Sequence, residues 1–126
     1  MNKLSPEKFL DLLAVRQDAI DKTLAQKAIE YSFDGDRLYN FNRAAQVNGT
    51  TAKKALWGMA TKHLISVQDL VEGRLANTAN NVNEKVGDMI NYLILLEGTL
   101  SIERESEYSI GCTVIQKSSE RSTHNG

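Results

Sequence analysis

Three polar side chains in the second half of the sequence have the spacing of a site on one face of a helix. Glu84, Asp88 and Asn91 fall at positions i, i+4 and i+7, so a helix places them one above another. They run into residues 90–96, which are apolar at nearly every position and therefore predict a buried helix. Because a buried carboxylate or amide is costly without a partner, this stripe requires a metal ion, a polar ligand or basic residues on another helix.

A second polar stripe precedes the first one in the chain. Lys62, Ser66 and Asp69 repeat the same spacing, and His63 lies beside them. Consecutive helices joined by a modest loop tend to pack antiparallel, so the two stripes could face each other. One interpretation is a binding site between them. The other is a structural network in which Lys62 or His63 neutralises Asp88, and the spacing favours neither.

A third group of candidates lies in residues 31–43, where aromatic rings alternate with arginines and amides. Arg37, Tyr39 and Asn40 are its central members, and such a mixture suits a surface that stacks bases and contacts phosphate. Arg37 near the start of a helix would reinforce the preference of that end for anions. In the alternative interpretation, the apolar residues of the segment are core and its arginines are solvated.

The elements that must position these residues are predicted to be helices. The single proline, the 6% aromatic content and glycines that fall mostly at breaks favour an all-α fold. We expect a bundle of about four helices, over residues 6–31, 36–47, 52–72 and from the asparagine-rich approach at 77–83 to about 104. Residues 1–105 are predicted to form one domain. Residues 106–126 are predicted to be an extension, with a short extended segment at 108–115 and a disordered tail from 117.

Composition and charge exclude several classes of protein. The formal net charge of −1 gives no strong signal for nucleic acid, and no apolar run reaches the roughly 20 residues that span a bilayer. The first residues lack the apolar segment of a signal peptide, and one cysteine, Cys112, cannot form an internal disulfide. We therefore expect a soluble, cytosolic protein. The leucines and isoleucines of 90–96 cover more of the helix than three partner helices bury, which predicts a homo-oligomer.

Three ordered motifs carry a resemblance to a known family. They are residues 36–41, residues 55–59 followed by Lys62, His63 and Ser66, and residues 84–88 followed by Asn91 and Tyr92. Over about residues 27–100 the chain resembles small phage and prophage proteins of the nucleotide-modification-associated helical domain family. The resemblance implies a phage-encoded helical protein that handles nucleotides in the cytoplasm of an infected or lysogenic bacterial host.

The last predicted helix is also similar to the last metal-binding helix of MazG-like all-α nucleotide pyrophosphohydrolases. Those enzymes have two adjacent acids, two further residues and an aspartate, so Glu84 and Asp88 match while Lys85 replaces the second acid. On the preceding helix they hold magnesium with a Glu-Glu-x-x-Glu cluster, whereas residues 52–68 contain no acid. The multi-ion cluster is therefore not present in the sequence. Glu84 and Asp88 could still hold one Mg²⁺.

These observations favour a pocket with both signs of charge that binds a nucleotide or a nucleotide-derived small molecule. Basic side chains would hold phosphate, amides or Asp88 would read ribose or base edges, and a tyrosine would stack on the base. The candidate residues are Arg37, Tyr39, Asn40, Lys62, His63, Ser66, Asp88, Asn91 and Tyr92. Binding would serve nucleotide metabolism or modification, or sequestration of a nucleotide signal in host defence. One alternative is a magnesium-dependent pyrophosphohydrolase with a reduced site of Glu84 and Asp88, and another is a non-catalytic structural or partner-binding bundle.

Overall fold

The protein is all-α, as predicted, and the described residues contain no strand. The computed structural model describes residues 2–118, with side chains for residues 2–107. Helix α1 (Pro6–Ile20), the π-helical turn η1 (Asp21–Ala25) and α2 (Gln26–Glu30) form one continuous rod. They are followed by α3 (Tyr39–Asn48), α4 (Ala52–Val71) and α5 (Ala79–Ser118). No helix within the described residues is long and apolar enough to cross a membrane.

Local chemistry accounts for where the helices begin and end. The Ser5 hydroxyl accepts a hydrogen bond from the Lys8 amide at 3.1 Å, and Pro6 takes the first helical position of α1. The Thr51 hydroxyl accepts from the Lys54 amide and caps α4. Between them, α3 ends at Gly49, whose left-handed φ of 64° suits a residue without a Cβ atom.

A tight turn joins α2 to α3. Asp34 and Gly35 both have positive φ, 56° and 73°, which matches the Asp-Gly preference of a two-residue hairpin turn. The Asp36 carboxylate then accepts from the Leu38 amide and from the Asn42 side chain, each at 2.9 Å. Asp36 therefore orders the approach to α3 from outside the helix, and α3 begins at Tyr39, three residues later than expected.

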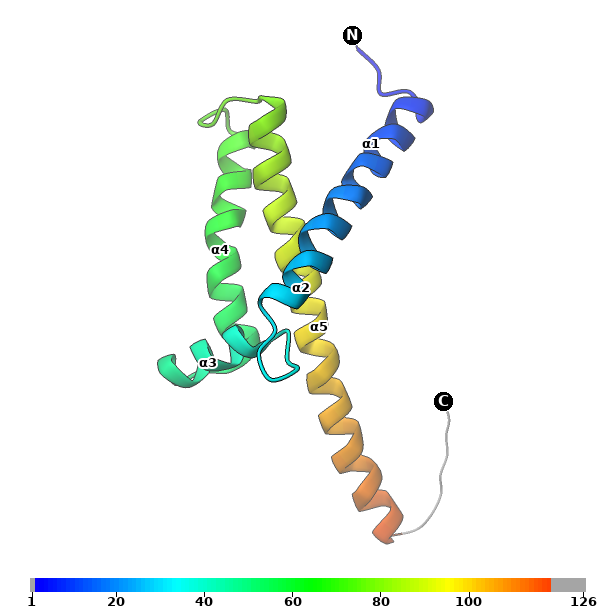
Figure 1. The fold of residues 1–126 in the computed structure, drawn as a ribbon, viewed down its shortest axis with the longest axis vertical. Helices are drawn as coiled ribbons and strands as arrows, with labels where there is room; N and C mark the ends of the chain where they lie inside the picture. Colours follow the sequence, from blue (N-terminus) through cyan, green and yellow to red (C-terminus); the bar gives the residue numbers. More distant parts are fainter. Residues whose placement is uncertain (1, 119–126) are drawn as a thin grey trace.

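The arrangement is an α4–α5 hairpin with α3 across one end and the α1–η1–α2 rod lying over α5 (Figure 1). The small buried core lies where α3, α4 and α5 meet and consists of Phe41, Ala45, Leu56 and Ala60. The Thr99 hydroxyl is also buried and donates to the Leu95 carbonyl at 3.0 Å. Helix α1 adds no buried residue, because it crosses α5 and then leans away from the hairpin.

The C-terminal part of the chain differs from the prediction. Residues 108–115 were expected to form a short extended segment, yet α5 continues through them to Ser118. Extending an existing helix needs no new nucleation, so the growing helix overrides the weak β-propensity of this stretch. The boundary expected at residue 105 consequently falls inside α5. The disordered tail was predicted from Lys117, but Lys117 and Ser118 still belong to α5, and the rest of the predicted tail, 119–126, lies outside the described residues.

Candidate functional site

A cavity of about 250 Å³ lies where the α1–η1–α2 rod meets α3, α4 and α5. Its polar lining comes from η1, α2 and the α2–α3 turn on one side and from α5 on another. Leu24, Phe41, Met59 and Leu95 supply its apolar lining. A concave site with a few converging polar groups on an apolar frame is the usual form of a small-molecule pocket.

Two cations and an aromatic ring form the first polar wall. The Lys27 ammonium lies 5.5 Å from the centre of the Tyr31 ring, and the Arg37 guanidinium carbon lies 5.8 Å from it. All three side chains line the cavity, together with Asn40 of α3. Because both cations gather around one ring, this wall carries positive charge beside an aromatic face and favours an anion attached to a planar group.

The second polar wall belongs to α5, where Asp88, Asn91 and Tyr92 line the cavity. The Asn91 Oδ1 atom is buried and accepts no hydrogen bond within the described residues. A buried acceptor without a donor lowers the free energy of unfolding, because folding removes its hydrogen bonds to water and replaces them with none. It therefore suits a ligand that brings an N–H or O–H group to this position.

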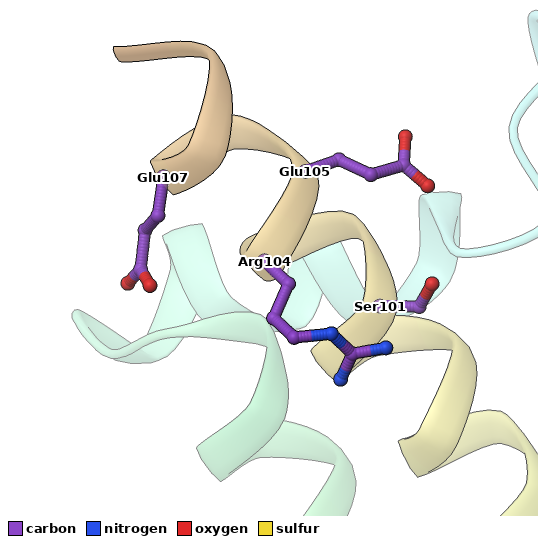
Figure 2. A pocket seen from close by; sticks show the side chains of 4 residues that line it. All are labelled: Ser101, Arg104, Glu105 and Glu107. Carbon is purple, nitrogen blue, oxygen red and sulfur yellow. The ribbon is translucent and has the colours of Figure 1, made fainter. Parts of the chain in front are cut away.

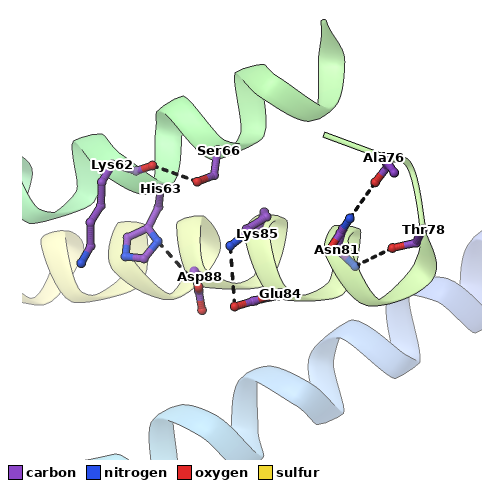
Figure 3. Close-up of polar contacts among 9 residues, drawn as sticks. All are labelled: Lys62, His63, Ser66, Ala76, Thr78, Asn81, Glu84, Lys85 and Asp88. Atoms are coloured by element: carbon purple, nitrogen blue, oxygen red, sulfur yellow. Dashed lines mark hydrogen bonds and ion pairs between the residues drawn. The ribbon is translucent and has the colours of Figure 1, made fainter. Parts of the chain in front are cut away.

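His63 of α4 contacts this wall from outside the cavity. Its Nδ1 atom lies 3.6 Å from Asp88 Oδ2 (Figure 3). Its ring lies 4.7 Å from the Tyr92 ring. Tyr92 also meets Phe41 edge-on at 6.4 Å. The predicted facing of His63 and Asp88 is thus observed. His63 does not line the cavity, so its place is that of a support for Asp88 and Tyr92.

Three of the predicted site residues lie elsewhere. The Ser66 hydroxyl donates to the Lys62 carbonyl within α4 at 3.1 Å, and the ion pairs of the described residues do not include Lys62 (Figure 3). Tyr39 packs on Phe33 at 4.7 Å and does not line the cavity. A repeat of i, i+4 and i+7 shows that residues share one face of α4. It does not show whether that face is rotated toward α5 or away from it.

The cavity also contains residues that sequence reasoning did not select, namely Thr23, Leu24, Lys27, Tyr31 and Met59. Thr23 and Leu24 belong to the π-helical turn η1, and such turns often occur at functional sites. Nothing in the sequence signals a π-turn. The aromatic and basic content of residues 27–31 was the available signal for Lys27 and Tyr31.

The predicted magnesium ligands do not share one site. Asp88 lines the cavity, whereas Glu84 lies outside it and pairs with Lys85 at 3.7 Å. Among the described residues, no three His, Cys, Asp or Glu side chains come close enough together to hold a metal ion. Glu84 and Asp88 remain one helical turn apart, so any ion there would take most of its ligands from water or substrate.

A second hollow on α5 has a different character. It is open and is lined by Ser101, Arg104, Glu105 and Glu107 (Figure 2). Figure 2 shows these side chains pointing in different directions from the exposed helix, so they do not converge on a ligand. The cavity beside Tyr31 and Asn91 is therefore the candidate site.

Comparison with known proteins adds no relative to this description: no family model, no curated protein and no solved structure matches the chain.

Proposed function

We propose that the protein binds a nucleotide or nucleotide-derived small molecule in the cavity between α2, α3 and α5. The observation that carries this proposal is the combination of two features in one cavity. Lys27 and Arg37 surround the Tyr31 ring, and the buried Asn91 Oδ1 lacks a donor among the described residues. A nucleotide offers the matching groups, since it joins an anion and a planar ring with exocyclic or ribose donors.

The charges suggest how such a ligand would lie. Lys27 and Arg37 supply charge-assisted hydrogen bonds to phosphate oxygens. Asn91 accepts from an amino or hydroxyl group, and Asn40 and Asp88 are within the same cavity for other polar edges. The volume of about 250 Å³ is below the range of roughly 300–1,000 Å³ common for small-molecule sites. We infer that the base or ribose enters the cavity while the phosphate stays at its cationic rim.

This proposal keeps Arg37, Asn40, Asp88, Asn91 and Tyr92 in the site. It transfers the phosphate-binding role from Lys62 to Lys27 and the stacking role from Tyr39 to Tyr31. The resemblance to phage nucleotide-handling proteins that was drawn from the sequence motifs points to the same ligand class, although no family model matches the chain. In that setting the protein acts in nucleotide metabolism or modification, or withholds a nucleotide signal of host defence.

Two alternatives each have an observation in their favour. The Asp88 carboxylate lines the cavity, where it could bind one Mg²⁺ together with water and substrate phosphates, and this favours a magnesium-dependent pyrophosphohydrolase in which Glu84 takes no part in the cavity. The 3.6 Å contact of His63 with Asp88 supports a structural bundle in which the polar stripe only closes the hairpin. Binding and hydrolysis assays on one set of variants separate all three.

The test is calorimetry and thermal shift with a panel of nucleoside mono-, di- and triphosphates and cyclic nucleotides, with and without Mg²⁺. We expect binding without magnesium, and Lys27→Gln should weaken it by about 10-fold or more, as expected for a lost charge-assisted bond. Lys62→Gln is the matched control, because it removes an exposed lysine outside the cavity and should leave affinity unchanged.

Other outcomes assign the site differently. Binding that requires magnesium, with release of pyrophosphate that Asp88→Asn abolishes, would establish the hydrolase. Absence of binding to the whole panel would refute the proposal and favour the structural bundle.

A further inference from the structure

The α5 wall of the cavity carries hydrogen-bond acceptors that the described residues leave without donors. Asp88 and Asn91 lie three residues apart, so they share one face of α5, and both line the cavity. Asn91 Oδ1 is buried without a donor, and no side-chain hydrogen bond among the described residues involves Asp88. His63 Nδ1 is 3.6 Å from Asp88 Oδ2, which is longer than a hydrogen bond. The Asp88 side chain is 41% exposed, so a ligand can reach both of its oxygens.

This pattern of acceptors limits what a ligand can present to α5. An ionised carboxylate only accepts hydrogen bonds, and so does the buried amide oxygen of Asn91. An acceptor atom of the ligand placed against them would be repelled by the carboxylate and would stay without a donor. The wall therefore favours a ligand edge on which several N–H or O–H donors are neighbours.

Guanine is the standard nucleobase whose edge has this arrangement. Its N1–H donor is next to its 2-amino group, which has two further N–H donors. Adenine and cytosine have a ring nitrogen that accepts beside their amino group, and uracil and thymine have one N–H between two carbonyl oxygens. A polar site binds a ligand less tightly when the ligand leaves the groups of the site unpaired, so these other bases should bind more weakly than guanine.

The two hydroxyl groups of a ribose are also neighbouring donors, but the ribose is the poorer match because of its place in a nucleotide. It lies between the phosphate and the base. Lys27 and Arg37, around the Tyr31 ring on the other wall, would hold the phosphate. The ribose then stays near these cations, and the outer edge of the base reaches farther toward α5. The buried position of Asn91 Oδ1 fits this inner end of the ligand.

Building on the nucleotide binding proposed above, we propose that the ligand is a guanine nucleotide. Asp88 accepts from N1–H with one carboxylate oxygen and from the 2-amino group with the other. Asn91 Oδ1 accepts from the second hydrogen of the same amino group. Asp88 is thus the residue that distinguishes guanine from the other bases, whereas Lys27 and Arg37 bind phosphate whatever the base is.

Isothermal titration calorimetry with nucleoside 5′-monophosphates tests the choice of base. GMP should bind about 10-fold or more tightly than IMP, which lacks only the 2-amino group, because hydrogen bonds of that group to the site are lost. AMP should bind about 100-fold more weakly than GMP, because its N1 acceptor would face the Asp88 carboxylate. The matched control for the sugar is 2′-deoxy-GMP, which should bind within about 2-fold of GMP.

Asp88→Asn tests the residue by an exchange of specificity. The amide has one oxygen that accepts and one NH₂ group that donates. This pair matches xanthine, which has an N1–H donor beside a carbonyl oxygen at C2. The variant should bind GMP about 10-fold or more weakly than the native protein and bind XMP more tightly by a similar factor, a gain that a disturbed fold would not produce. Glu84→Gln is the matched control, because it neutralises a carboxylate of α5 outside the cavity and should leave the order of affinities unchanged.

The results distinguish this proposal from nucleotide binding itself. Equal affinities for GMP and AMP, or an affinity that depends on the 2′-hydroxyl group rather than on the base, would overturn guanine recognition and leave nucleotide binding in place. An Asp88→Asn variant that still prefers GMP to XMP would refute the role given to Asp88. Absence of binding to every nucleotide would overturn both proposals.

Discussion

Replacing Asn91 with leucine should make the protein more stable and at the same time remove its ligand binding. The Asn91 Oδ1 atom is buried without a hydrogen-bond partner among the described residues, and a buried unsatisfied polar atom costs about 1–3 kcal/mol. Leucine has a similar shape and no polar atom, and the adjacent cavity gives it room. Asn91→Leu should therefore raise the free energy of unfolding by about 1–3 kcal/mol.

The assay is urea denaturation followed by far-UV circular dichroism, with all proteins at one concentration because dimerisation would contribute to stability. In a thermal scan the same gain corresponds to a rise in Tm of about 4–12 °C for a domain of this size. Asn83→Leu is the control for helix propensity, since Asn83 is exposed on the same helix and its replacement should change stability by less than about 0.5 kcal/mol.

In Asn91→Leu the free energy of unfolding should rise while the affinity for nucleotide falls. A more stable protein that no longer responds to nucleotide would mean that Asn91 is kept for binding at the expense of stability. A loss of stability in Asn91→Leu would refute this, because it would show that the amide is satisfied in the free protein and contributes to the fold.

Two further predictions concern the frame of the site. Leu56 is fully buried where α3, α4 and α5 meet, so Leu56→Ala should lower the free energy of unfolding by about 2–5 kcal/mol, measured by urea denaturation, with unchanged stability counting against the assigned core. Gly49→Ala should destabilise the protein by about 1–2 kcal/mol, because φ at this position is 64°, whereas Gly98→Ala in the middle of α5 should stabilise it by about 0.5–1 kcal/mol. Equal effects of the two glycine substitutions would show that backbone strain at the end of α3 has no part in stability.

The sequence predicted the helical elements well, because their signals are local. The helix starts expected at residues 6 and 52 and the helix end expected at 47 agree with the structure to within one residue, and each depends on a few neighbouring residues around Ser5, Thr51 and Gly49. The helical course of residues 108–115 was missed, since short-range β-propensity could not reveal that an established helix would run through them.

The predicted site residues coincide only in part with the lining of the cavity, because the sequence does not fix how each helix is rotated about its axis. Asp88 and Asn91 of the predicted stripe line the cavity together with Tyr92, whereas Glu84 of the same stripe lies outside it. On α4, His63 beside the predicted stripe contacts Asp88 from outside the cavity, and none of Lys62, Ser66 and Asp69 lines it, because the sequence fixes a helix face but not its rotation toward a neighbour. Lys27 was not selected, because the sequence does not indicate that the α1–η1–α2 rod lies over α5.

The π-helical turn at Asp21–Ala25 has a consequence for how α1 is rotated relative to the cavity residues Lys27 and Tyr31. A π-turn accommodates one residue more than a regular α-helix, and one residue corresponds to a rotation of about 100°. The turn η1 therefore sets the rotation of α1 about its own axis, relative to Lys27 and Tyr31 that follow it in the chain. If all five residues of η1 were regular α-helix, with none removed, Phe9 and Leu13 would be turned by about a quarter of a revolution relative to Lys27 and Tyr31. The π-turn thus decides which side of α1 is turned toward α5, although none of its own residues lies in α1.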